Sequence, residues 1–458
     1  MITTMLLTLL SELFSKIELG ASGALFMILY ILIQWPKLPI SGKVLTIGAG
    51  ILILIAVSTS HPLNLIIPAL ERAAFMGAFL TSLSLLRAAA EDSAGVRRCG
   101  HYLLSQKSSS RYFSFFIGGT LFGAIINVGV LNLFGAMLKS AQATDDNPQN
   151  KILHYIQTKR SLTPLLRGFA CSLLWSPLAI SLAITLKALP NLSWATVLLG
   201  GFIITIIFYL VGWIFDNLSH RKFQMIDVPM TRKHDWKSFL FPVLLNLSIF
   251  IIALCTKRFT NISLVGGVMT GASIIAILWL LIQGIKRKNR ENLLSHPLNR
   301  LSIFLKIMVP TYRMQIVIMS TAGFFGAIVS YFLDPRMIIE SLAWLNAPPF
   351  IIPAVILTTI IGCGLLGLNP VMTVVIIASA LPNPSDFQIP SVTLGLTYLI
   401  AWGLTIGSSP VAMSTLIIGS IADKKGSEVG LKWNGIYTFG CALIASIVLG
   451  LSILILPL

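Results

Sequence analysis

The chain has 458 residues, of which 55% are hydrophobic and 11% are charged. Its mean hydropathy is +0.87, whereas a soluble domain carries about 25% charged residues. This composition excludes an ordinary soluble enzyme, a disulfide scaffold and a nucleic-acid-binding protein, and it predicts an integral membrane protein. Lys and Arg outnumber Asp and Glu by 33 to 16, an excess that in membrane proteins reflects orientation.

Apolar segments long enough to cross a hydrocarbon core of about 30 Å as helices recur along the whole chain. In chain order we predict spans at 3–15, 21–34, 43–59, 62–86, 168–187, 192–215, 238–256, 261–285, 314–333, 391–421 and 434–457. Between them lie a basic amphipathic stretch at 87–111, a polar loop at 139–166, a charged loop at 217–237 and two glycine-interrupted apolar stretches at 112–138 and 348–382. We therefore expect an all-α polytopic membrane protein with about 11 transmembrane helices.

The two interrupted stretches decide the topology. If both are re-entrant hairpins, one side of the membrane receives the basic residues of 87–111, 139–167, 221–237, 286–313 and 424–432. The other side then receives only Lys187, Lys257, Arg258 and Arg336. By the positive-inside rule the first side is cytoplasmic, where the stretch 87–111 forms an interfacial arm against anionic lipid. Full crossings would reverse every loop between the two stretches.

This topology predicts two re-entrant hairpins, a cytoplasmic N-terminus and an extracytoplasmic C-terminus in the cell (inner) membrane. The first ten residues lack a basic region and a cleavage site, so we expect a first helix and not a signal peptide.

An internal repeat is indicated by three motifs that recur in the same order. Phe75-Met76-Gly77-Ala78 recurs as Phe324-Phe325-Gly326-Ala327, and the apolar sequence around Asn127 recurs around Asn369. Ser176-Pro177-Leu178-Ala179-Ile180-Ser181 recurs as Ser409-Pro410-Val411-Ala412-Met413-Ser414, 233 positions later. Small and apolar residues are common in membrane helices, so composition alone is the competing explanation. The charge-derived topology places the copies on opposite sides of the membrane, which predicts an inverted repeat.

The repeat predicts four parts. Residues 1–61 form N-terminal scaffold helices, and residues 62–216 form repeat 1, with a hairpin at 112–138 and a discontinuous helix at 168–187. A cytoplasmic linker occupies 217–237. Residues 238–458 form repeat 2, with a hairpin at 348–382 and a discontinuous helix at 391–421.

Broken helices leave backbone amides and carbonyls without partners inside the bilayer, at several kcal/mol each unless they line a cavity or bind a ligand. We interpret Gly119, Gly123 and Gly129, with Gly362, Gly364 and Gly367, as residues that interrupt the two apolar stretches. Asn127 and Asn369 then form the tips, where they bind solute or merely cap a turn. Pro177 and Pro410 each free a carbonyl, unless they mark simple proline kinks.

This order of elements resembles the ion transporter superfamily, most closely the divalent anion/sodium symporter (DASS) family. Members carry Ser-Asn-Thr at both hairpin tips; here Asn127 and Asn369 match the central Asn, with Ile126, Val128, Leu368 and Pro370 beside them. The resemblance implies a homodimeric elevator transporter. We assign substrate binding to Asn127, Asn369, Ser176, Pro177, Ser409 and Pro410, and ion-binding candidates are Gly123, Val128, Gly129, Ser172, Gly367, Thr405 and Ser408.

The function that we expect is secondary active transport of a small anionic solute, a carboxylate or an inorganic oxyanion, across the cytoplasmic membrane. Coupling is to sodium or to protons, and scarce acidic residues in the spans favour sodium. We expect no cofactor, no metal beyond sodium and no enzyme activity, because the spans lack His, Asp or Cys clusters. The alternatives are a passive channel or pore for small solutes and a membrane-embedded enzyme acting on a lipid-linked substrate.

Overall fold

The computed structural model describes residues 1–91, 93–104, 106, 108–140, 148–189, 191–220, 236–286, 302, 309–332, 348–381 and 384–455. Every regular element within these ranges is helical. Ten of the described helices are long and apolar enough to cross a membrane. The prediction of an all-helical, multi-pass membrane protein is therefore confirmed.

The described helices gather in two compact units. Unit 1 comprises Met1–Ser93, Leu245–Ser341 and Val374–Pro382, and unit 2 comprises Ala94–Leu244, Leu342–Thr373 and Asn383–Leu458. Each unit collects segments from distant parts of the chain, whereas the four predicted parts follow one another along it. Those four parts are defined by repeat symmetry, which this division does not address, so their boundaries stay a prediction.

Unit 1 is built around one long helix, α4. Its elements are α1 (Ile2–Phe14), α2 (Ile17–Gln34), η1 (Trp35–Lys37), α3 (Ile40–Val57), α4 (Pro62–Glu91), most of α11 (Leu240–Phe259), α12 (Leu264–Lys286), α14 (Val309–Thr311), α15 (Arg313–Phe332) and the second part of α18 (Pro370–Ala380). Helices α1, α2, α12 and α15 all pack on α4. Small residues allow this, because a Cβ added to Gly77 would lie 2.8 Å from the Ser320 hydroxyl oxygen.

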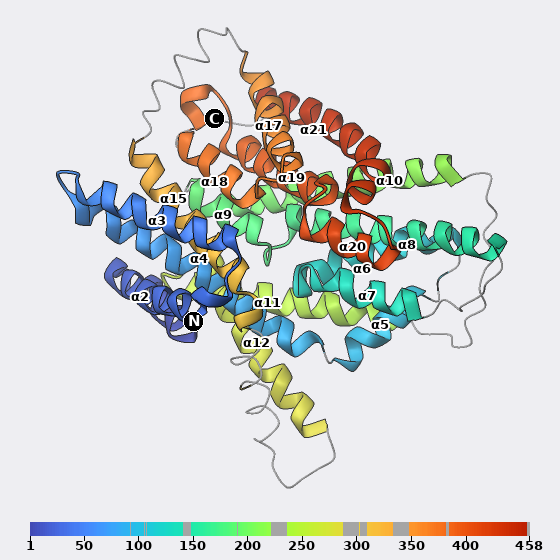
Figure 1. Cartoon of the computed structure of the whole chain (residues 1–458), viewed down its shortest axis with the longest axis horizontal. Coiled ribbons are helices and arrows are strands. Elements are labelled where there is room, and N and C mark those ends of the chain that lie inside the picture. The colour runs from blue at the N-terminus through green and yellow to red at the C-terminus, as the bar shows by residue number, and fades with distance from the viewer. Residues whose placement is uncertain are drawn as a thin grey trace. The chain divides into compact units, whose positions relative to one another are not determined.

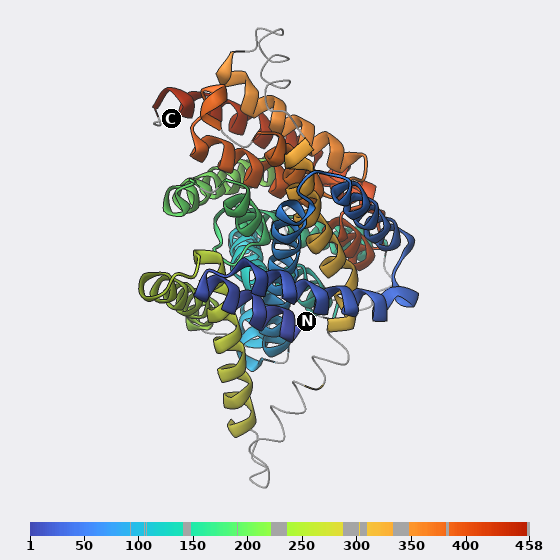
Figure 2. The same ribbon diagram turned by 90° about the vertical axis from the view of Figure 1, so that its left-hand side faces the viewer.

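Unit 2 has α8 (Pro148–Trp175) and α19 (Ser391–Ser408) at its centre. Around them lie α5 (Ala94–Leu104), α6 (Ser108–Ile126), α7 (Gly129–Ser140), α9 (Ile180–Ala188), α10 (Trp194–His220), η2 (Trp236–Phe239), η4 (Pro349–Ile351), α17 (Ile352–Leu365), η5 (Pro384–Phe387), α20 (Met413–Ala422), the π-helix η6 (Glu428–Trp433) and α21 (Gly435–Ile455). Helix α6 packs along α8, and α8 packs on α19. Helices α17, α19 and α21, coloured orange to red, run side by side in Figure 1 and Figure 2.

Two expectations about local structure were wrong. The polar loop at 139–166 is largely helix, because α8 begins at Pro148, whose missing N–H suits a first helical turn. Buried Leu162, Leu165 and Leu166 then continue the apolar face of the span. Residues 141–147, and 221–235 of the expected linker, lie outside the described residues.

The second correction concerns the glycines. Gly119 and Gly123 lie within α6, and Gly362 and Gly364 lie within α17, so none of the four interrupts its helix. A Cβ at Gly119 would collide with the Leu165 backbone oxygen. Gly119 therefore permits close helix packing, as small residues commonly do between membrane helices.

A carboxylate holds the start of α12 within unit 1. Glu12 accepts hydrogen bonds from the Ser263 hydroxyl (2.8 Å) and the Ser263 backbone N–H (3.2 Å), and the Ser263 hydroxyl in turn accepts from the N–H of Gly266 (3.1 Å). The pair therefore caps an otherwise open helix N-terminus.

We expect Glu12→Ala to destabilise the protein by about 1–2 kcal/mol, because the cap loses its acceptor. The measurement is the melting temperature of the purified protein in detergent. Glu18→Ala is the matched control, because Glu18 is exposed on α2. Equal melting temperatures for the two variants would contradict this role of Glu12.

Candidate functional site

Two helix breaks in unit 2 have the same pattern of backbone hydrogen bonds. Residues 176–179 separate α8 from α9, and residues 409–412 separate α19 from α20. Each connection begins with a Ser-Pro pair, and equivalent positions are 233 residues apart. In both, the Ser N–H bonds back to a carbonyl four residues earlier, and the Ala at the end of the connection bonds to the Ser carbonyl.

A serine just after each break donates a hydrogen bond back to the helix that precedes the break. The Ser181 hydroxyl donates to the Leu173 backbone oxygen at 2.6 Å, and the Ser414 hydroxyl donates to the Ile406 oxygen at 2.6 Å. Both donors and both acceptors differ by 233 positions. These serines end the repeated motifs in the sequence, but their role was missed because their hydrogen bonds span eight residues.

The helices that follow the breaks begin without a side-chain cap. The N-cap residues are Ala179 for α9 and Ala412 for α20, and neither helix start receives a side-chain hydrogen bond. Alanine is among the poorest N-cap residues. The first N–H groups of both helices therefore point out of the helix with no intrahelical acceptor, and the partial positive charge of a helix N-terminus accompanies them.

The first interrupted stretch folds back on itself at Asn127. The rings of Phe122 and Phe134 meet edge to face with centroids 5.3 Å apart, although 12 residues of straight helix would separate them by roughly 18 Å. Asn127 has φ 54°, and its side-chain oxygen accepts from the N–H of Val128 at 2.7 Å. Its side-chain NH2 group donates to no described residue, so the turn uses the oxygen of this amide and not its NH2 group.

The second interrupted stretch uses a glycine and an asparagine in succession. Helix α17 ends in a turn where Gly367 takes φ 98° and the N–H of Leu368 reaches the Cys363 oxygen at 3.0 Å, a common helix C-terminal motif. Asn369 then caps α18, because its side-chain oxygen accepts from the N–H of Val371 at 2.9 Å. The Asn369 NH2 also donates to no described residue. Both asparagines therefore cap turns and keep their amide donors available.

The arms of both stretches contact the broken helices at equivalent positions. A Cβ at Gly123 would lie 2.9 Å from the Ser172 hydroxyl oxygen, and a Cβ at Gly364 would overlap Thr405, which is 233 positions after Ser172. The Ser409 hydroxyl also donates to the Gly364 oxygen at 2.7 Å. The structure therefore brings Gly123 to Ser172, and it brings Thr405 and Ser409 to α17.

The other candidate residues lie at the tips and breaks. Val128 and Gly129 follow Asn127 in the first turn, Gly367 lies near Val411, and Ser176 accepts from the N–H of Leu178 at 3.2 Å. Pro177 and Pro410 occupy the second position of each break, and Ser408 is the last residue of α19.

Glycines from other helices cover the carbonyls at the breaks, a contribution that sequence reasoning missed. Gly201 of α10 lies against the Leu174 oxygen, and Gly430 of the π-helix lies against the Ser408 oxygen, so closely that a Cβ at either would overlap it. Single glycines in apolar helices carry no signal that identifies their partner. The acceptor side of each break is therefore covered by a glycine from another helix.

The two breaks differ in exposure although their backbones agree. Leu178 is 1% exposed and Ile180 is 9% exposed, whereas the equivalent Val411 and Met413 are 55% and 52% exposed. At the tips, Ile126 is 1% exposed and Leu368 is 57% exposed. The first break is therefore enclosed and the second is open.

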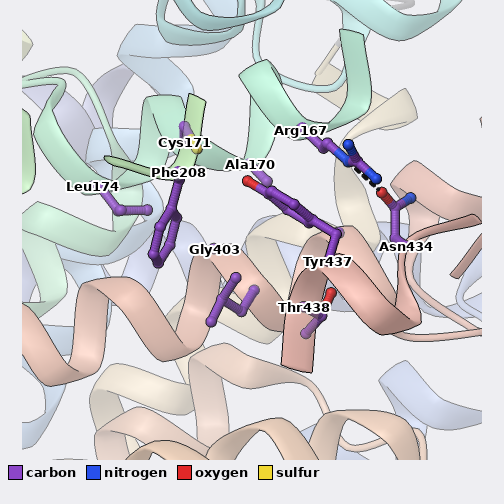
Figure 3. A pocket seen from close by; sticks show the side chains of 11 residues that line it. Arg167, Ala170, Cys171, Leu174, Phe208, Gly403, Asn434, Tyr437 and Thr438 are labelled. Carbon is purple, nitrogen blue, oxygen red and sulfur yellow. Dashed lines mark hydrogen bonds between the residues drawn. The ribbon is translucent and has the colours of Figure 1, made fainter. Parts of the chain in front are cut away.

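A small cavity lies between α8 and α19, just before both breaks. Its volume is about 10 Å³, enough for a single water molecule. Ala170, Cys171 and Leu174 of α8 face Gly403, Leu404 and Gly407 of α19, each pair 233 positions apart. Figure 3 shows that the hydroxyl end of Tyr437 points toward Ala170 and Cys171, with Arg167 and Asn434 joined by a hydrogen bond beside its ring.

A larger cavity of about 230 Å³ lies along α6 and α10 and reaches Trp175 at the end of α8. It is lined mainly by apolar and aromatic side chains, including Phe113, Phe116, Phe202 and Tyr209. Such a lining offers few hydrogen-bond donors to a polar solute.

The described residues contain no group of three or more His, Cys, Asp or Glu side chains that could hold a metal ion. Outside the candidate spans, burial raises the pKa of the Cys99 thiol to about 12. Cys99 is therefore protonated at neutral pH and is a poor nucleophile.

The fold of the chain resembles that of a known membrane transporter. It aligns with the YdaH transporter of Alcanivorax borkumensis, whose crystal structure is described as revealing an unusual topology, with a TM-score of 0.56 and 13% sequence identity. The alignment covers 90% of this chain and 98% of the transporter chain. No family model matches the chain, and no curated protein sequence matches it. The likeness shows a shared fold.

We expect Ser181→Ala and Ser414→Ala each to destabilise the protein by about 1–3 kcal/mol, because each leaves a buried carbonyl at a break without its donor. Thermal unfolding in detergent measures this loss. Ser446→Ala is the control, since the Ser446 hydroxyl bonds only to the Ala442 carbonyl within α21. Variants at 181 and 414 that unfold like the Ser446 variant would show that these hydroxyls are dispensable.

Proposed function

We propose that this chain is a secondary active transporter that binds a small anionic solute between its two broken helices. The solute is a carboxylate or an inorganic oxyanion, and the transporter fold shared with YdaH supports the general class. The observation that supports an anionic solute is the pair of helix starts at α9 and α20, neither of which has a side-chain cap. Helix N-termini bind anions through hydrogen bonds from their N–H groups and through the helix dipole.

The asparagines complete this proposed site. Asn127 and Asn369 each spend the side-chain oxygen on a turn and keep two N–H donors. Donors are what an anionic oxygen requires. Their position at the tips of the two interrupted stretches matches the central Asn of the DASS motif, so the finer resemblance to that family is part of the proposal.

Coupling to sodium or protons is also part of the proposal. The hydroxyls of Ser172 and Thr405 occupy equivalent positions where the arms meet the broken helices. Each donates to a carbonyl of its own helix, which leaves its oxygen lone pairs free for a cation. Discontinuous helices in transporters commonly coordinate sodium or protons in this region.

We further propose an elevator mechanism acting through an inverted repeat. The matching backbone bonds at the two breaks, with the equivalent bonds of Ser181 and Ser414, support a repeat. The fold-back of α6 and α7 supports a re-entrant hairpin. The homodimer, the inner-membrane location and the sides of the two termini stay predictions.

Asn127→Ala and Asn369→Ala should each abolish solute uptake into proteoliposomes, because each removes two donors from the site. Both variants should remain folded, since a cap contributes only about 1 kcal/mol. Asn132→Ala on α7 is the control, because Asn132 is exposed beyond the tip. Normal uptake by both tip variants would remove the asparagines from the site.

The proposed function itself is tested with succinate, benzoate, sulfate and phosphate as probes. Uptake into proteoliposomes is measured with an inward sodium gradient, with an inward proton gradient and with neither. We expect accumulation of at least one anion only when one of the gradients is present. Equal flux under all three conditions would indicate a passive pore, and chemical conversion of a probe would indicate an enzyme.

A further inference from the structure

Arg167 is a buried charge that forms no ion pair with any residue that the structure describes. It is 6% exposed, and its Nε donates to the Asn434 side-chain oxygen at 2.9 Å. Longer hydrogen bonds run to the Trp433 and Gly212 backbone oxygens, at 3.3 and 3.4 Å, and to the Tyr112 hydroxyl at 3.4 Å. The guanidinium carbon also lies 4.0 Å from the centre of the Tyr437 ring. Every one of these partners is neutral.

Its neighbour Arg160 shows the usual arrangement. Arg160 forms an ion pair with Asp216 at 2.7 Å, whereas no described carboxylate lies within ion-pair distance of Arg167. Neutral hydrogen bonds and an aromatic ring make burial of the guanidinium tolerable. They do not cancel its charge, so a positive field extends into unit 2. An ionisable group kept in such a place commonly serves function.

Arg167 lies near enough to the first break for its electrostatic field to reach it. Arg167 is on α8, nine residues before Ser176, which corresponds to roughly 13 Å along the helix. The cavity between the equivalent residues of α8 and α19 lies along this path. The equivalent of Arg167 in the second repeat is Ile400, which is fully buried. The repeat therefore supplies two similar breaks but only one central charge.

We infer that Arg167 is the specificity-determining charge that makes the site select anions. This inference rests on the proposed function and adds to it the residue that sets the preference for negative charge. The guanidinium does not touch the solute; it acts through its field. At an effective dielectric constant of about 20, a unit charge at this distance changes the binding of a monovalent anion about tenfold.

Three variants separate charge from packing. Arg167→Gln removes the charge and keeps polar contacts, and Arg167→Lys keeps the charge without the planar group. Asn434→Asp leaves Arg167 in place and puts a carboxylate against its Nε, so it neutralises the field without deleting the arginine. If Arg167→Gln fails to fold, Asn434→Asp still tests the charge.

The experiment measures uptake of succinate, benzoate, sulfate and phosphate by the full chain in proteoliposomes, together with thermal unfolding of each variant. For the anion with the highest wild-type uptake, we expect Arg167→Gln and Asn434→Asp to raise KM about tenfold with little change in kcat. Arg167→Lys should stay within about threefold of wild type. A purely structural role predicts an unchanged KM for folded Asn434→Asp protein, which retains the arginine and its hydrogen bond. This variant loses only the donation from the Asn434 amide to the Val429 oxygen, at 3.2 Å.

Two results overturn the inference, and they differ from failure of the proposed function. An unchanged KM in folded Asn434→Asp protein shows that the charge does not act on the solute. A KM that rises equally in Arg167→Lys shows that the shape of the side chain matters and its charge does not. Wild-type protein that takes up none of the four anions would instead contradict the proposed function, and this inference with it.

Discussion

The organisation of unit 2 depends on how opened backbone groups are satisfied in apolar surroundings. Each broken helix exposes acceptors at the end of its first half and donors at the start of its second half. The acceptors are covered, because Ser181 and Ser414 bond back across the breaks and glycines lie against the neighbouring carbonyls. The second halves begin after alanines, which provide no side-chain cap. Both breaks therefore combine covered acceptors with a helix N-terminus, where the helix dipole places partial positive charge.

The places where the helices break could be predicted from the sequence, but what surrounds them could not. Pro177 and Pro410 lie at the breaks because proline lacks the N–H that a continuous helix needs. Asn127 lies at a turn because it adopts a left-handed backbone more readily than its apolar neighbours. Gly119 and Gly364 were misread, because a glycine that weakens a helix and one that admits a neighbouring helix look the same in sequence. Only the opposing helix decides between these roles, and it comes from a distant part of the chain.

The environment of a charged residue likewise depends on contacts from distant parts of the chain, which the local sequence does not reveal. Counting Lys and Arg along the chain groups Arg167 with the cytoplasmic loop that precedes its span, beside Lys159 and Arg160. In the structure α8 extends back through that loop, and Asn434 and Tyr437 come from far along the chain to enclose the guanidinium. A hydropathy profile assigns every arginine the same free-energy cost of burial in the membrane. Whether an arginine reaches water or stays inside depends on contacts that form only when the two breaks are brought together.

The side chains at the two breaks differ in exposure, although the breaks have the same backbone arrangement. Their backbone hydrogen bonds match, although Ser176 accepts from Leu178 whereas Ser409 donates to Gly364. The difference lies in what covers Leu178 and leaves Val411 uncovered. The unequal exposure therefore arises from the neighbouring side chains and helices, because the backbone bonds at the two breaks match.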